Sequence, residues 1–274
     1  MDESTPSENL SPLEGFGFEV RSQREGRKLT QKHVAKAIGY SEAYVSRVES
    51  GKLMPSEKFA RGCDLVFGTH GIFERLRRRI AEGEHPTWFV PYLQLEPRAV
   101  GIRDFSAQLI MGLVQTEAYA EAIFRAAHPR AESEVIDGKV AARLRRQDIF
   151  AASEPPALWL IVHEMCLRTL VGGRAVMAGQ LEHLLTYATS PHMDLQVLPF
   201  SAGVPDGEML SFTLLSFDNS PTVVYSGDRR GGRVYDAPKV VRGSVDAYDR
   251  LRAHALSPDD SVALVTSLLK EYRS

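Results

Sequence analysis

Apolar residues recur at three- and four-residue spacings through the first third of the chain. The repeat runs from Phe16 to Leu76, and it has the period of helices that bury one face. Gly, Ser, Thr and Pro interrupt it at 26–30, 39–41, 51–55 and 68–71, where we expect one helix to end and the next to begin. The pattern therefore predicts five short helices between residues 12 and 80, packed as one all-α domain.

A different pattern, with both helical and strand-like segments, occupies residues 102–274. Helical spacing predicts helices at 103–127, 131–151, 174–189, 237–255 and 258–272. Apolar runs bounded by Pro, Gly, Ser or Asp predict strands at 157–167, 193–200, 209–217 and 221–227. Consecutive strands among helices indicate an α+β domain with a small sheet flanked by helices, or a mixed α/β one.

Two segments show neither pattern. Residues 1–11 are rich in Ser, Pro and acidic residues, which predicts a disordered tail. The segment that precedes residue 102 contains three prolines and no sustained period, so we expect a connector. Its Trp88, Phe89 and Tyr92 are expected to dock on a neighbouring element. The chain is thus predicted to be multidomain, with a tail at 1–11, an all-α domain at 12–80, a connector at 81–101 and an α+β domain at 102–274.

Composition narrows the class of protein. Of the 274 residues, 43% are hydrophobic and 25% are charged, which suits a folded globular chain rather than a disordered one. The two cysteines, Cys63 and Cys166, lie in different predicted domains, so neither a disulfide framework nor a Cys-x-x-Cys metal site is expected. The first residues lack a signal-peptide pattern, and no run of eighteen apolar residues occurs. We expect a cytoplasmic protein without a membrane segment.

The net charge of −2 hides a strong asymmetry along the chain. Residues 12–80 carry fourteen Lys or Arg against eight Asp or Glu, a net charge of +6. The tail carries −3 and the remainder of the chain −5. A basic field confined to one small domain is typical of a polyanion-binding unit, although a merely soluble basic surface would look the same.

Residues 31–50, QKHVAKAIGYSEAYVSRVES, satisfy the requirements of a helix-turn-helix. Two helices that cross steeply need a small residue at the crossing and a turn with unusual backbone angles, which Ala35 and Gly39 supply. Thr30 and Ser41 are suited to cap the two helices. Inward positions are apolar: Val34, Ile38, Val45 and Val48. An ordinary helical hairpin is the alternative.

The outward face of the second helix favours DNA binding. Near its N-terminal end this face is short and polar, with Glu42, Ala43, Ser46 and Arg47. A recognition helix has this distribution, because its first residues meet base edges in the major groove. For Glu42, a solvated acid favoured by the helix dipole is the alternative.

Residues 16–80 resemble the Xre, or lambda-repressor-like, family of helix-turn-helix domains. The resemblance lies in the stretch LTQKHVAKAIGYSEAYVSRVESGKLMPS. This stretch includes the pattern Ser-Arg-x-Glu-x-Gly near its end. The resemblance implies DNA contacts by Gln31, Ser41, Glu42, Ala43, Tyr44, Arg47 and Lys52. Arg47 would bind guanine, Glu42 would accept from a cytosine amino group, and Ala43 would touch a thymine methyl. Gln31, Tyr44 and Lys52 would lie near phosphates and Ser41 at the groove edge. Glu49 is expected to be structural.

The rest of the chain resembles actinobacterial regulators whose C-terminal half is a domain of unknown function, often described as antitoxin-like. The matching stretches are MGLVQTEAYA (111–120), VAARLRRQDIF (140–150), LQVLPFSAG (195–203) and DAYDRLRAHALSPDDSVALV (246–265). The resemblance implies a transcriptional regulator encoded beside a small partner protein. It implies no ligand or catalytic residues.

Enzyme motifs are incomplete in this sequence. His163-Glu164-Met165-Cys166 lacks the second His of H-E-x-x-H and lies in a segment predicted as a strand. The fragment GDRRGGR (227–233) is neither G-x-G-x-x-G nor a Walker A loop, and a flexible basic turn is the better interpretation. Ser201 is not in a G-x-S-x-G elbow. We therefore expect no enzyme activity, no metal and no cofactor.

The C-terminal domain nevertheless needs a role, since a DNA reader requires only the first domain. Polar residues at helical spacing could converge on a cavity for a small effector: Gln115, Tyr119, Arg143, Gln147 and Glu164. Solvated or helix-pairing side chains are the equal alternative.

Together these observations predict a sequence-specific, DNA-binding transcriptional regulator in the cytoplasm. We expect a homodimer on an inverted-repeat operator in double-stranded DNA, with a C-terminal domain that senses a small effector or a protein partner. Two alternatives remain open. One is an antitoxin-like protein that mainly sequesters a small protein, and the other is an enzyme domain tethered to DNA.

Overall fold

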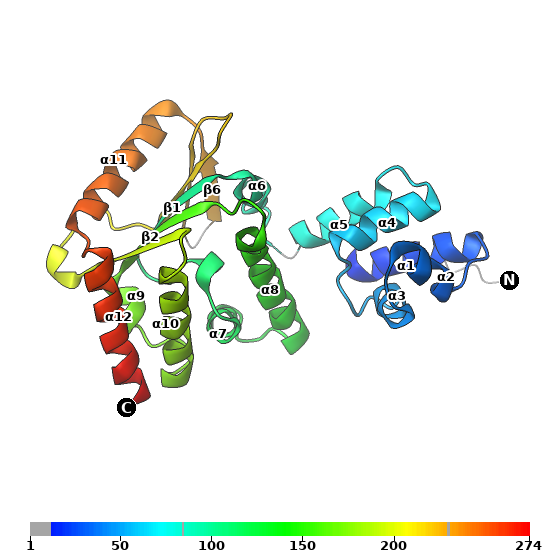
Figure 1. Ribbon diagram of the computed structural model, residues 1–274, viewed down its shortest axis with the longest axis horizontal. Helices are drawn as coiled ribbons and strands as arrows, with labels where there is room; N and C mark the ends of the chain where they lie inside the picture. Colours follow the sequence, from blue (N-terminus) through cyan, green and yellow to red (C-terminus); the bar gives the residue numbers. More distant parts are fainter. Residues whose placement is uncertain (1–11, 84, 229–230) are drawn as a thin grey trace. The chain divides into compact units, whose positions relative to one another are not determined.

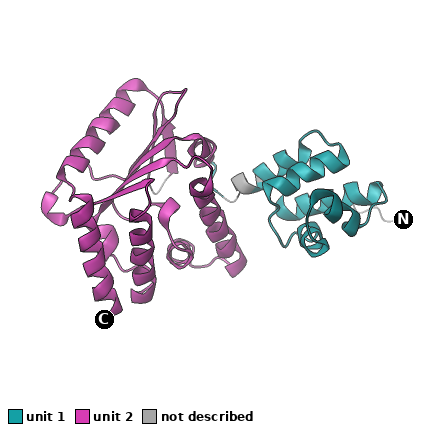
Figure 2. Cartoon of the chain, viewed as in Figure 1, with its two compact units in different colours: residues 1–87 teal, residues 88–274 magenta. Residues whose placement is uncertain are grey.

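A computed structural model describes residues 12–83, 85–228 and 231–274. The predicted tail at 1–11 lies outside the described residues. The chain forms two compact units, residues 1–87 and residues 88–274 (Figure 2).

Unit 1 is all-α, as predicted. Its described residues form five helices: α1 (Pro12–Gly26), α2 (Gln31–Ile38), α3 (Glu42–Glu49), α4 (Glu57–Phe67) and α5 (Ile72–Gly83) (Figure 1). One core joins their inner faces and includes Phe16, Val20, Val34, Ile38, Val45, Val48, Phe59, Cys63, Phe67 and Phe73. The burial of these apolar side chains stabilises helices that would be too short to persist alone.

The predicted helix boundaries in unit 1 follow from capping. Thr30 and Ser41 accept hydrogen bonds from main-chain N–H groups in the first turns of α2 and α3, as predicted, and Ser56 does the same for α4. Gly39 ends α2 and Gly68 ends α4, with φ of 79° and 67°. These left-handed conformations favour glycine because it lacks a Cβ.

Unit 2 is built on a six-stranded mixed sheet. The strands are β1 (Gly101–Ser106), β2 (Ala157–His163), β3 (Met193–Leu198), β4 (Phe212–Ser216), β5 (Val223–Asp228) and β6 (Gly231–Tyr235). Their order is β3-β2-β1-β4-β5-β6. β1, β2 and β3 are parallel, whereas β4 pairs antiparallel with β1 and starts an antiparallel meander. The expected sheet flanked by helices is confirmed.

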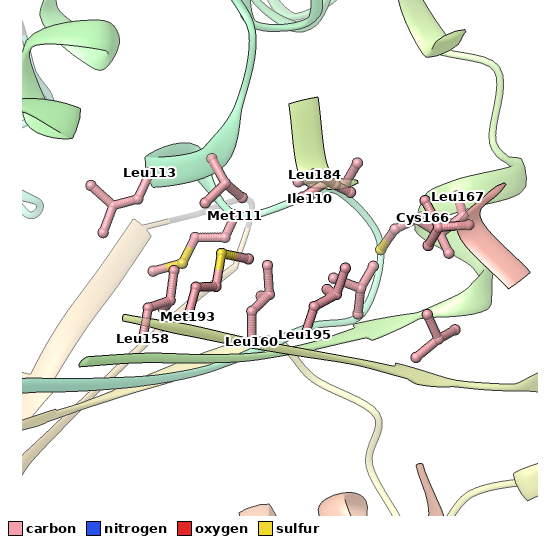
Figure 3. Packing of buried hydrophobic residues seen from close by; sticks show 14 of the residues in the cluster. Ile110, Met111, Leu113, Leu158, Leu160, Cys166, Leu167, Leu184, Met193 and Leu195 are labelled. Atoms are coloured by element: carbon pink, nitrogen blue, oxygen red, sulfur yellow. The ribbon is translucent and has the colours of Figure 1, made fainter. Parts of the chain in front are cut away.

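Helices cover both faces of this sheet (Figure 1). They are α6 (Val90–Leu95), α7 (Glu117–Ala127), α8 (Ser133–Arg145), α9 (Glu164–Arg168), α10 (Arg174–Ala188), α11 (Pro238–His254) and α12 (Pro258–Arg273). Alternate residues of each strand serve opposite faces, as the pleat requires. Figure 3 shows Leu158, Leu160 and Leu195 directed toward Met111 and Leu184 in the larger core. Ile161 and Leu214 instead meet Tyr248 and Leu251 of α11.

Three predicted elements in unit 2 need correction. Residues 101–106 form the strand β1 and not the start of a helix at 103. Arg103 and Asp104 interrupt the apolar run there, so the strand pattern is weak in the sequence. β2 ends at His163, and Glu164 begins α9 rather than continuing the strand. The predicted helix at 131–151 changes to a 3₁₀ helix at Arg146–Ala151.

The described residues of the fragment 227–233 belong to two paired strands, β5 and β6, rather than to a turn. Residues 229–230 lie outside the described residues. β6 was not predicted, because its Gly-Gly start is typical of a turn.

Candidate functional site

The two helices of the helix-turn-helix motif, α2 and α3, are packed into the core of unit 1. Val34, Ala35 and Ile38 of α2 are buried in the same core as Val45 and Val48 of α3. The buried apolar positions are those predicted from the sequence. The arrangement leaves the opposite side of α3 directed toward solvent.

The exposed side of α3 carries the predicted base-contacting residues. Ser41, Glu42, Ala43 and Arg47 are exposed, and so is Lys52 in the turn that follows α3. Among the described residues, no hydrogen bond or ion pair engages the side chains of Glu42, Arg47 or Lys52. These charged groups are therefore available to an external partner, and the α3 N-terminus adds a partial positive charge beside Glu42.

Gln31 and Tyr44 are half-buried and already take part in packing. Gln31 Nε2 donates to Glu49 Oε2 at 2.8 Å. The Tyr44 hydroxyl accepts the main-chain N–H of Ser56 at 3.0 Å, and its ring lies 5.2 Å from that of Phe59. Each side chain keeps a hydrogen-bond donor besides these contacts, so a phosphate contact stays a prediction for both.

A buried ion pair fixes α3 against α1. Arg24 Nε and Nη2 donate to the two carboxylate oxygens of Glu49, at 2.6 and 2.9 Å. Only 4% of the Glu49 side chain is exposed, which confirms its predicted structural role. Arg24 was not among the residues predicted from the sequence. Its signal is present, because Arg24 continues the buried four-residue steps of Phe16 and Val20.

In unit 2, four of the five proposed effector-site residues lie together. Arg143 Nη1 donates to Gln115 Oε1 at 2.8 Å, and Gln147 Nε2 donates to the Gln115 carbonyl oxygen at 2.7 Å. Gln115 Nε2 donates to the Ile110 carbonyl oxygen, and the Tyr119 hydroxyl accepts the Ile110 N–H. This group, which we call the Gln115 cluster, joins the loop before α7 to α8 and the 3₁₀ helix at 146–151.

Glu164 lies in a different part of unit 2. Its two carboxylate oxygens accept from Phe200 N at 2.9 Å and from Arg168 Nε at 2.7 Å. His163, the residue before it, caps α9 by accepting the Met165 N–H through Nδ1. Burial lowers the pKa of His163, which favours the neutral ring. These contacts give both residues a structural role at the end of β2.

A buried polar residue that was not predicted from the sequence, Gln180, binds the main chain on either side of Gln115. Gln180 of α10 is fully buried, donates to the Val114 carbonyl oxygen at 2.7 Å and accepts the Thr116 N–H at 2.8 Å. Its signal in the sequence is a polar residue among the buried positions Met177, Leu181 and Leu184 of one helix face.

The aromatic residues of the predicted connector are part of unit 2. Phe89 and Tyr92 stack at 5.1 Å, and each lies within 5.4 Å of the Tyr225 ring on β5. Arg146 lies over the Phe89 ring and forms a bidentate ion pair with Glu96, at 2.9 and 2.7 Å. The predicted docking of Phe89 and Tyr92 is confirmed.

Two family models match this chain. A helix-turn-helix domain matches residues 16–76, and a domain of unknown function (DUF5753) matches residues 89–267. The second match covers well over half of the chain. The chain belongs to the DUF5753 family. No curated protein and no solved structure matches it.

The DUF5753 match contains the sheet, the Gln115 cluster and the Arg146–Glu96 pair, whereas the helix-turn-helix match contains the exposed face of α3. In the part of the chain that the structure describes, no three His, Cys, Asp or Glu side chains are grouped to hold a metal ion. None of the described helices is both long enough and apolar enough to cross a membrane.

Proposed function

We propose that this protein is a sequence-specific, DNA-binding transcriptional regulator of the Xre type. The observation that carries the proposal is the exposed face of α3. Glu42 and Ala43 in its first turn and Arg47 in its last turn face solvent without a partner in the described part of the chain, on a helix-turn-helix whose inner face is buried. Polar groups that a packed scaffold holds outward are suited to direct readout in the major groove.

Electrostatics support a nucleic-acid partner for unit 1. The +6 charge of residues 12–80 contrasts with the −5 of the residues after 80. Neutralisation of phosphates by these Lys and Arg side chains releases counterions, which gives affinity that falls with salt. The charge supplies binding to any DNA, and the face of α3 supplies the choice of sequence.

Selection of bound fragments from genomic DNA by the full chain tests this function. We expect enrichment of one short motif, followed by binding of that motif in fluorescence anisotropy with a steep dependence on salt. A matched variant, Arg130→Gln, removes an exposed Arg from unit 2 and should bind the motif normally. Enrichment of no motif would contradict sequence-specific recognition.

A homodimer on an inverted repeat is the assembly that fits this function. One helix-turn-helix reads too few base pairs to define a genomic site, and two-fold symmetry doubles the number. The half-sites are then expected about one helical turn, roughly 34 Å, apart or a multiple of that. A monomer that binds a non-repeated site would contradict this assembly.

The DUF5753 unit is proposed to sense a small effector or a small protein partner and to change DNA affinity. The Gln115 cluster supports an effector, because it gathers polar groups beside the Arg146–Glu96 pair that holds the segment entering unit 2. An antitoxin-like role, in which the chain sequesters a partner protein, follows from its resemblance to actinobacterial regulators. Turnover by unit 2 alone would instead favour an enzyme. We place the protein in the cytoplasm, where its DNA would be.

A further inference from the structure

Arg143 is a charged residue that forms no ion pair with any residue the structure describes. The residue is half-buried, and its guanidinium lies 4.3 Å from the centre of the Phe124 ring. Its hydrogen bond within the described chain is to the neutral amide oxygen of Gln115. No described carboxylate lies within ion-pair distance of it. A guanidinium has five N–H donors, and only one of those of Arg143 has an acceptor among the described residues.

Arg146, about one helical turn further along, carries a guanidinium that has its counter-ion within the protein. Both of its hydrogen bonds go to the Glu96 carboxylate, whose side chain is 2% exposed. Burial, and after it the nearby positive charge of Arg146, lower the pKa of Arg143 to about 10, because both disfavour its charged form.

Gly112 brings the main chain against both guanidinium groups. A Cβ there would lie 3.1 Å from Arg146 Nη1 and 3.6 Å from Arg143 Nε. Gly112 thus supplies no side chain, and no acid, beside Arg143. Charged groups that are partly withdrawn from water are often paired, since desolvation of an ion costs free energy. A cation that lacks its partner in the free protein is typical of a binding site.

We propose that Arg143, with Gln115 beside it, binds a small oxyanion, either a carboxylate or a phosphate. The planar guanidinium donates in parallel to two oxygens of such a group. Because Phe124 covers one face of the guanidinium and Gln115 takes one donor, the remaining edge suits a single compact group. This proposal rests on the role of unit 2 as a sensor, and it names the chemical class of the effector.

Thermal unfolding of the full chain without DNA tests the site. The probes are acetate, succinate and inorganic phosphate, each at constant ionic strength balanced with chloride. We expect at least one probe to raise the unfolding midpoint saturably, by roughly 5 °C or more at a hundredfold excess over its Kd. The comparison among the three probes distinguishes a carboxylate ligand from a phosphate.

Three variants separate binding from a structural role. Arg143→Met should abolish the response to the probe, because the oxyanion partner is gone. Arg143→Lys keeps the charge but not the fork, and it should bind the probe roughly tenfold or more weakly while remaining folded. Arg130→Gln, which removes an exposed Arg, should respond like the unmodified chain.

Arg146→Met provides the structural reference, because it leaves Glu96 buried and unpaired. Its midpoint without any probe should fall far more than that of Arg143→Met. An equal fall in the two variants would assign Arg143 a structural role and overturn the proposal. Absence of a response to all three probes would also overturn it, as expected if an acidic side chain of a partner protein is the true ligand.

The outcome is independent of DNA binding. If a probe binds at Arg143 but operator affinity does not change, the oxyanion site stands and the sensing role fails. If the chain binds no DNA at all, the response to the probe still decides the site.

Discussion

At the scale of single residues, we expect Arg47 on α3 and Lys52 in the turn after it to contribute differently to DNA binding. Arg47→Ala should weaken binding to the selected operator by roughly 1 to 3 kcal/mol and leave binding to random DNA nearly unchanged, because a base contact carries sequence information. Lys52→Ala should weaken both, because a phosphate contact does not. Anisotropy titrations on the two DNAs make the comparison. Equal losses on both DNAs for Arg47→Ala would remove it from base reading.

A second residue-scale prediction concerns the buried carboxyl of Asp104 in β1. It accepts from Thr213 Oγ1 at 2.6 Å and Ser106 Oγ at 2.7 Å. Burial raises its pKa to about 6, although these hydrogen bonds and Arg146 oppose the rise, which Glu96 assists. Between the unfolded pKa near 4 and the folded pKa, the folded chain binds more protons than the unfolded chain.

The contribution of Asp104 to stability should therefore be largest at low pH and be lost as pH rises through about 6. In that window the free energy of unfolding should fall by at most about 1.4 kcal/mol per pH unit through this group. Asp104→Asn should remove this slope, which urea unfolding of the variant and the unmodified chain at pH 5 and pH 7 would measure. A stability difference between the two that does not change with pH would contradict the prediction.

At the scale of elements, the packing of α1 on α3 depends on one glycine. A Cβ at Gly17 would lie 2.4 Å from the Val48 carbonyl oxygen, whereas a Cβ at Gly15 would meet nothing within 4 Å. Gly17→Ala should destabilise unit 1 by roughly 1 to 3 kcal/mol, because main-chain atoms must move. Gly15→Ala, in the same helix, should be neutral or stabilising by up to about 1 kcal/mol. Chemical unfolding compares them, and similar values would contradict the predicted close approach.

At the scale of the whole molecule, the segment that enters unit 2 is predicted to belong to its fold. A fragment 88–274 should fold, because Phe89, Tyr92 and Glu96 remain with their partners. A fragment 101–274 leaves Arg146 without Glu96 and exposes the Tyr225 ring. It should be less stable by roughly 3 to 5 kcal/mol from the broken buried pair alone. Urea midpoints of the two fragments test this, and equal midpoints would show that the segment is a simple linker.

The sequence alone determined unit 1 well, because its signals are local. Helix period, the caps at Thr30 and Ser41 and the turn at Gly39 depend on residues within four positions of one another. The same locality located the exposed end of α3, since burial of Val45 and Val48 decides which side faces outward. A strand such as β1 is defined by neighbours that lie far away in the chain, and its Arg103 and Asp104 obscured it.

Only the tertiary structure decided the polar interior of unit 2. The partners Glu96 and Arg146 are fifty residues apart, and Gln180 meets Thr116 across sixty-four. No local sequence pattern predicts such pairs, because each contact depends on how the strands and helices of unit 2 are arranged in space. The sequence groups Gln115, Tyr119, Arg143, Gln147 and Glu164 as candidates for one effector site. The first four lie together in the fold, whereas Glu164 lies at the end of β2, and the binding of an effector stays a prediction. The polarity and spacing of residues can be read from the sequence. The pairing of a buried charge cannot, because it depends on which distant elements the fold brings together.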